Sequence, residues 1–164
     1  MTPIQGTMMT PANIEREEME GAAAPIRLTK ELLKERFDEY NRLYFEGKLK
    51  HPAKFATSSH HHALACTNGV AISFSANYNW DEWLLRTALV HEMIHMAIKQ
   101  AKGMGANKNT GHGEDFLEIM DRLNEQYGLD LSTRVSEELI DRYVKPQYRS
   151  KPSWWSQLWR RIFG

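Results

Sequence analysis

The segment from Leu84 to Ile98 constrains the fold of this chain more than any other. Leucine, valine, methionine and isoleucine recur in it at spacings that cover most of a helical circumference, so the sequence predicts a deeply buried helix. The same run contains three titratable side chains, His91, Glu92 and His95, in the pattern H-E-x-x-H. A buried helix can hold such groups only where they are hydrogen-bonded or bind a metal ion.

The two histidines lie four positions apart, which places both imidazoles on one face of the helix, one turn from each other. Two nitrogens in that arrangement can bind a single tetrahedral Zn²⁺ ion. Glu92 lies about 100° further around the helix, where its carboxylate can act on a zinc-bound water as general base. The alternative is a buried helix with two core histidines whose hydrogen bonds are satisfied within the protein.

A catalytic zinc ion usually has three protein ligands and one open position for water. His112 is the best candidate for the third ligand, because Gly111 and Gly113 on either side let the backbone turn sharply toward the first helix. Alternatives remain open for this stretch. His112 can be a surface histidine in a helix-capping loop. Glu114 or Asp115 can bind the metal ion, orient an imidazole or stabilise the start of the next helix.

Hydrophobic periodicity and capping residues predict four helices. Thr29 can cap the first of them. The central helix begins near Asn79 or Asp81, and Asn79 as N-cap would place Glu82 at the third helical position, as in a capping box. The expected ranges are 29–45, 79 or 81 to 102, 114–127 and 136–144.

Residues 52–75 have the short, partly alternating apolar pattern of β-strands. Asn68 and Gly69 separate two such runs and both tolerate a positive φ, which favours a hairpin turn. The sequence therefore predicts a small antiparallel sheet of about three strands. Together with the helices, this sheet gives an α+β fold.

The composition is that of a single globular domain without a disulfide framework. The chain has 164 residues, 41% hydrophobic content and a formal net charge of zero, which supplies a core and gives no global signal for nucleic acid. Cys66 is the only cysteine, so an internal disulfide and a Cys-x-x-Cys zinc ribbon are excluded, as suits a reducing compartment such as the cytoplasm. No apolar stretch predicts a signal peptide or a membrane span.

Both ends of the chain differ in composition from the central domain at 27–144. Residues 1–26 are small, polar and acidic and are expected to be disordered. Residues 145–164 carry five Lys or Arg, no Asp or Glu, and three tryptophans. This basic, Trp-rich tail can pack on the domain as a helix, lie at an anionic membrane surface, or contact a partner protein or nucleic acid. The three histidines at 60–62 are expected in a solvated loop or strand edge.

Three ordered motifs of the chain resemble those of a known family. The motifs are YNRLYFEGKL at 40–49, LVHEMIHMAI at 89–98 and GHGEDF at 111–116. They resemble those of the SprT-like zinc metalloprotease domain, a family that also includes the eukaryotic DNA-repair protease Spartan. The resemblance covers roughly residues 27–127. Many family members carry a Cys-rich zinc ribbon after this domain, which a chain with one cysteine does not contain.

The resemblance implies a mini-zincin-like fold in which His91, His95 and His112 bind zinc and Glu92 is the catalytic base. It also implies that VAISFS at 70–75 is the sheet edge along the cleft, to which an extended peptide can add as a strand. The substrate would then be a protein or peptide. A link to DNA-associated proteins, and to DNA itself, is implied by the family alone.

The sequence thus predicts a zinc-dependent peptidase with a zinc-activated water and a glutamate base. One alternative is a zinc-containing binding module that the basic tail recruits to nucleic acid or a membrane, without proteolysis. Another is a metal-dependent hydrolase whose substrate is not a peptide. Tyr78, beside the predicted edge strand, is a candidate for stabilising the oxyanion.

Overall fold

The computed structural model describes residues 25–59, 63–103 and 111–149. In chain order it contains α2 (Lys30–Tyr44), β1 (Lys54–Ser58), β2 (Ala65–Thr67), β3 (Ala71–Ser75), α3 (Glu82–Lys102), α4 (Glu114–Tyr127), α5 (Glu137–Tyr143) and the 3₁₀ turn η1 (Pro146–Tyr148). The predicted α+β class and all four predicted helices are confirmed. No helix in these ranges is long and apolar enough to cross a membrane. The N-terminal segment, the histidines at 60–62 and the C-terminal tail lie wholly or mostly outside the described residues.

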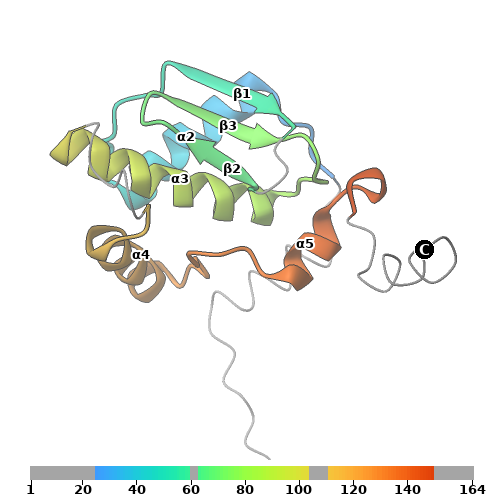
Figure 1. The fold of residues 1–164 in the computed structure, drawn as a ribbon. Helices are drawn as coiled ribbons and strands as arrows, with labels where there is room; N and C mark the ends of the chain where they lie inside the picture. The colour runs from blue at the N-terminus through green and yellow to red at the C-terminus, as the bar shows by residue number, and fades with distance from the viewer. Residues whose placement is uncertain (1–24, 60–62, 104–110, 150–164) are drawn as a thin grey trace, which may run out of the picture.

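The long helix α3 is the centre of the fold (Figure 1). The sheet covers it on one side, α4 and α5 lie on the other, and α2 packs against both α3 and β1. Seven side chains of α3 are fully buried, which confirms the prediction from its apolar circumference: Leu84, Leu85, Leu89, Val90, Met93, Ile94 and Met96. The polar groups in the middle of this helix, such as Glu92, are therefore close to the core.

Helix α2 begins where the capping pattern predicts. The Thr29 hydroxyl accepts a hydrogen bond from the backbone N–H of Leu32 at 3.1 Å, which satisfies one of the free donors of the first turn. Leu33, Phe37 and Tyr40 recur at helical spacing and are buried against the rest of the core.

The sheet is mixed, and the prediction of a wholly antiparallel sheet is wrong for one strand pair. Its strand order is β1-β3-β2, with β2 antiparallel and β1 parallel to β3. Consecutive strands do run in opposite directions, but β3 inserts between β1 and β2 instead of adding at the edge. The tight turn at Asn68 and Gly69 joins β2 to β3 as predicted, and the Asn68 side chain accepts hydrogen bonds from the backbone N–H groups of Val70 and Ala71.

The expectation that residues 70–75 form the sheet edge along the cleft is also wrong. β3 is the middle strand, and its Ile72 and Phe74 are fully buried. The edge strand beside α3 is β2, where Cys66 is exposed. Three residues with the sequence ACT carry too short a pattern to reveal an edge position, since a single apolar side chain defines no period.

Asp81, and not Asn79, is the N-cap of α3. Its carboxylate accepts a hydrogen bond from the backbone N–H of Leu84 at 2.7 Å. Glu82 does not complete a capping box with Asn79. Its two carboxylate oxygens instead accept bonds of 2.8 and 3.0 Å from the Arg36 guanidinium, which connects α2 to α3.

The backbone before Asp81 pairs with the end of α5 and with the residue after Val144. The Asn79 N–H donates to the Tyr143 carbonyl at 2.7 Å, and the Lys145 N–H donates to the Asn77 carbonyl at 2.8 Å. The Tyr143 hydroxyl also donates to the second carboxylate oxygen of Asp81 at 2.8 Å. The end of α5 is thereby fastened to the start of α3.

Candidate metal centre

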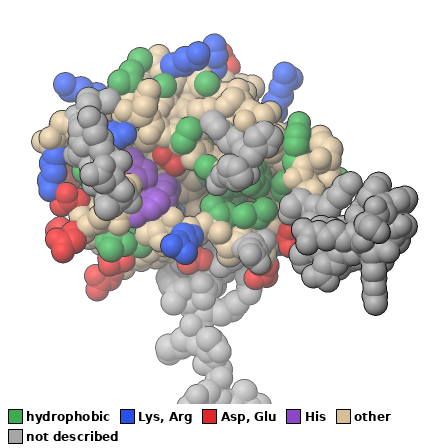
Figure 2. Space-filling view, in the orientation of Figure 1, with side chains coloured by type: hydrophobic (Ala, Val, Ile, Leu, Met, Phe, Trp, Pro, Cys, Tyr) green, Lys and Arg blue, Asp and Glu red, His purple; other side chains and the backbone are tan. Residues whose placement is uncertain are grey.

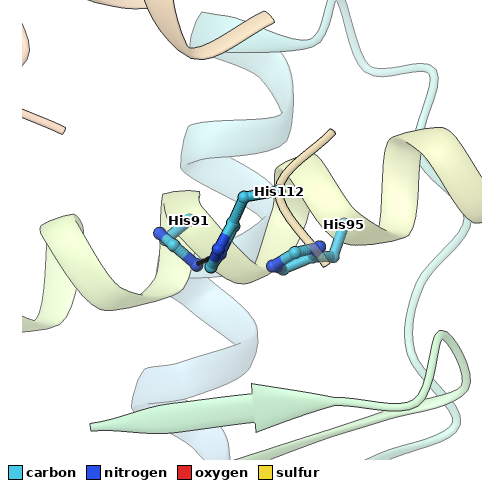
Figure 3. A group of neighbouring side chains, drawn as sticks. All are labelled: His91, His95 and His112. Carbon is cyan, nitrogen blue, oxygen red and sulfur yellow. Dashed lines mark hydrogen bonds between the residues drawn. The ribbon is translucent and has the colours of Figure 1, made fainter. Parts of the chain in front are cut away.

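Three histidines converge at the middle of α3. His91 and His95 come from successive turns of this helix, and His112 reaches the same place from the turn before α4 (Figure 3). One ring nitrogen from each lies within 4.8 Å of the others. The Nε2 atoms of His91 and His112 are 3.0 Å apart. Three imidazole nitrogens gathered in this way could hold a metal ion and leave a coordination position open.

Gly111 and Phe116 explain how His112 reaches the two histidines of α3. Gly111 has a φ of 59°, in the left-handed region that favours glycine, and Gly113 caps α4. Phe116 is fully buried, and its ring centroid lies 4.5 to 4.8 Å from the centroids of all three imidazoles. The first turn of α4 therefore holds His112 in place and supplies an apolar support under the cluster.

Burial keeps the histidine cluster in its metal-binding protonation state. Desolvation, together with the proximity of the other imidazoles, lowers the pKa of His91 to about 4 and that of His95 to about 3. Burial also lowers the pKa of His112. Three neutral imidazoles present lone pairs near neutral pH, so these residues fit a divalent metal ion.

A backbone carbonyl fixes the tautomer of His91. The Nδ1 atom of His91 lies 3.1 Å from the carbonyl oxygen of Ser132, which only accepts hydrogen bonds, so Nδ1 is the donor. Its lone pair is therefore on Nε2, the atom that faces His112. No sequence pattern identified Ser132, because every residue carries a backbone carbonyl.

The two acidic residues that follow His112, Glu114 and Asp115, lie outside the histidine cluster. Asp115 forms an ion pair with Lys102 at the end of α3, and Glu114 is exposed in the first turn of α4. Both stand where the positive end of a helix favours a carboxylate. The described residues contain one group of histidine, cysteine and acidic side chains suited to a metal ion, and neither acid belongs to it.

Glu92 is buried beside the histidines, on the side of α3 that faces β2. Desolvation raises the pKa of its carboxyl to about 7, against the opposing effects of Lys99 and of a hydrogen bond from the Thr67 backbone. It lines the same cavity as the three histidines. The carboxyl thus lies at the wall of the cavity beside the three histidines and is not part of the group that could hold a metal ion.

This cavity has a volume of about 790 Å³ and runs along α3. Residues at every fourth position of the helix line it: Trp83, Thr87, His91, His95 and Lys99. Strand β2 forms one wall and residues 130–140 form the other. In Figure 2 the histidines are visible from outside next to an apolar patch, so the metal centre is accessible to a ligand from solvent.

Tyr78 lies outside this cavity, so the predicted oxyanion role does not fit its position. Its backbone forms a bridge with Val144, and its side chain is buried in the core. The order of residues along the chain suggested proximity to the cleft, but β2 rather than β3 borders α3.

Comparison with known proteins places these motifs in one family. A search of the curated proteins found no match. The model of the SprT-like family matches residues 33–139, a span that includes the metal centre, Glu92 and both walls of the cavity up to the start of α5. All three motifs of the sequence resemblance lie within this span. The chain therefore belongs to the SprT-like family.

Proposed function

We propose that this protein is a zinc-dependent peptidase in which His91, His95 and His112 bind the ion and Glu92 is the general base. The observation that carries the proposal is the convergence of three neutral imidazoles beside a buried carboxyl in an accessible cavity. Zinc bound there supplies a Lewis acid and lowers the pKa of water to roughly 7. Glu92 accepts a proton from the attacking water at a carboxylate oxygen and then gives it to the nitrogen of the leaving amine.

The cavity walls support a peptide as substrate. In the described ranges β2 pairs with β3 on one side, and its other edge faces the cavity, where the Thr67 backbone donates a hydrogen bond to Glu92. This edge borders the same cavity as the histidines. An extended peptide lying in the cavity along β2 would place one of its carbonyl groups next to the three histidines.

Metal content and chelator sensitivity test the proposal directly. The purified protein is expected to contain about one zinc ion per chain. It should cleave casein, lose this activity on treatment with a chelator, and recover it when zinc is restored. Zinc without cleavage would favour the non-proteolytic binding module, and a folded protein that binds no zinc would remove the proposal.

The cavity also supports a preference for apolar substrate side chains. Its end near the start of α3 is lined by Trp83, Ala88, Leu139 and Ile140, whereas the opposite end is lined by Lys99. Trp83 stacks on Tyr143 at a centroid distance of 6.1 Å, which fixes this apolar end between α3 and α5. We infer that it receives a large apolar side chain close to the scissile bond.

Leu139→Gln is expected to lower kcat/KM for peptides with leucine or phenylalanine near the scissile bond by about tenfold relative to alanine peptides. The added amide places a polar group where the substrate side chain loses water. Leu117→Gln, on an exposed position of α4, is the matched control. An equal loss for all peptides would show that Leu139 does not determine specificity.

A further inference from the structure

The segment between α4 and α5 is important for the metal centre although it contains no helix or strand. The segment comprises residues 128–136. It begins at Gly128, the C-cap of α4, whose φ of 65° lets the chain turn back at the end of the helix. Within this segment, the carbonyl of Ser132 accepts the hydrogen bond from Nδ1 of His91 at 3.1 Å. The position of the segment therefore determines how the imidazole of His91 is oriented.

One side chain of α4 holds this segment. The amide nitrogen of Asn124 donates to the Leu131 carbonyl at 2.9 Å, and its amide oxygen accepts from the Leu131 N–H at 2.9 Å. Asn124 thus binds both polar backbone groups of the residue that precedes Ser132. Leu129 and Leu131 are each only 6% exposed, so their side chains anchor the same stretch in the core.

Ser132 itself is fixed by a local turn. Its hydroxyl accepts from the Arg134 N–H at 3.2 Å and donates to the Arg134 carbonyl. The Ser132 hydroxyl thus bonds to Arg134 in the same segment, whereas the Ser132 backbone carbonyl bonds to His91. The connection from Asn124 to the imidazole then consists of two hydrogen bonds to Leu131, one peptide unit and one hydrogen bond to Nδ1.

We propose that Asn124 is a positioning residue of the metal centre. By fixing Leu131 it places the Ser132 carbonyl, which keeps His91 in the Nδ1–H tautomer and presents Nε2 to the metal ion. The proposal rests on the metal-binding part of the proposed function and is independent of proteolysis. Removal of a group that hydrogen-bonds a ligand imidazole directly, as the Ser132 carbonyl does here, typically changes metal affinity by about 10- to 100-fold, and displacement of that carbonyl in an Asn124 variant should have an effect toward the lower end of this range.

The chain contains a matched control for this residue. Asn41 near the end of α2 makes the same pair of bonds with Leu49, at 3.0 and 3.1 Å. Both asparagines lie close to a helix end and hold the segment that follows. Leu49 borders a separate hollow of about 420 Å³ whose lining includes none of the three histidines. Replacement of Asn41 therefore removes an equivalent pair of hydrogen bonds without affecting His91.

The test compares Asn124→Ala with Asn41→Ala in the full-length protein. Both variants are expected to lower the Tm by similar amounts, because each loses the same two bonds. At a temperature where both are folded, Asn124→Ala should weaken zinc affinity by at least about tenfold in competition with a chromophoric chelator. Asn41→Ala should stay within about twofold of the wild type, as expected for a purely structural contact.

A readout without metal separates this proposal from the proposed function. In the metal-free protein, ring ¹⁵N chemical shifts should show His91 as a single Nδ1–H tautomer in the wild type and Asn41→Ala, and as a mixture in Asn124→Ala. Should Asn124→Ala fail to fold, Asn124→Asp, which keeps the acceptor for the Leu131 N–H, is expected to show smaller changes in the same direction.

Unchanged zinc affinity and tautomer in the Asn124 variants, or equal changes in both asparagine variants, would overturn the positioning role. A wild-type protein that binds no zinc would contradict the proposed function. The tautomer measurement in the metal-free protein would then still test whether Asn124 positions the Ser132 carbonyl against His91.

Discussion

Glu92→Gln is expected to reduce peptide cleavage by about 10²- to 10⁴-fold while leaving zinc content unchanged. The amide has nearly the same volume as the carboxylate and can still accept the hydrogen bond from the Thr67 backbone, so the wall of the cavity is preserved. It cannot accept a proton from water. Cleavage of casein and zinc stoichiometry, measured on the same preparation, separate these two effects.

Glu118→Gln, on the exposed face of α4, is the control for removal of a carboxylate and should retain full activity. Turnover by zinc-loaded Glu92→Gln at the wild-type rate would exclude Glu92 as the base. Loss of zinc from this variant would instead assign the carboxylate a role in holding the metal centre.

The same substitution has a predicted effect on stability in the metal-free protein. Burial raises the folded-state pKa of Glu92 to about 7, above its unfolded value. The folded state therefore binds the proton more tightly, and stability falls as pH rises from about 4.5 through 7. Glu92→Gln should accordingly raise the Tm at pH 8 relative to the wild type and change it little at pH 4. An equal shift at both pH values would contradict this assignment.

His112→Ala is expected to lower zinc affinity by more than about 100-fold, beyond the loss typical of a residue that only orients a ligand. Two imidazoles one turn apart on α3 would remain, and they cannot complete the three-ligand set of a catalytic zinc ion. Zinc content after dialysis and affinity in chelator competition measure the effect. Peptide cleavage should fall in parallel with metal occupancy.

His51→Ala is the corresponding control, because its imidazole packs on Phe37 and Phe55 away from the metal centre. It should retain zinc. A His112→Ala protein with wild-type zinc content would move the third ligand to another residue, with Glu114 and Asp115 the nearest acids in sequence.

The sequence predicted the parts of the site that depend on local geometry. The spacing of His91 and His95 fixes their common face once the helix is known, and the glycines around His112 indicate a turn toward it. The helix boundaries followed from caps and periodicity for the same reason. These features depend on residues within about one or two turns of each other.

Other features depend on contacts between distant segments, which no periodic pattern records. The alternation in residues 70–75 indicates two buried side chains but does not specify which strands lie on either side. The Asp81 carboxylate that caps α3 is also held by the Tyr143 hydroxyl, 62 positions away in the chain. The contact of Ser132 with His91 depends on a backbone group common to all residues. Edge assignment, cap choice and tautomer control therefore required the structure.

The hydrogen bonds between the end of α5 and the start of α3 have a consequence for the order in which the cavity is assembled during synthesis. One wall of the cleft and the carbonyl that orients His91 come from residues 130–144, near the end of the described chain. A nascent polypeptide that has exposed α3 but not α5 has both α3 histidines without a closed cleft. Since chains emerge from the ribosome N-terminus first, this arrangement delays completion of the cavity around His91 until residues 130–144 have been synthesised.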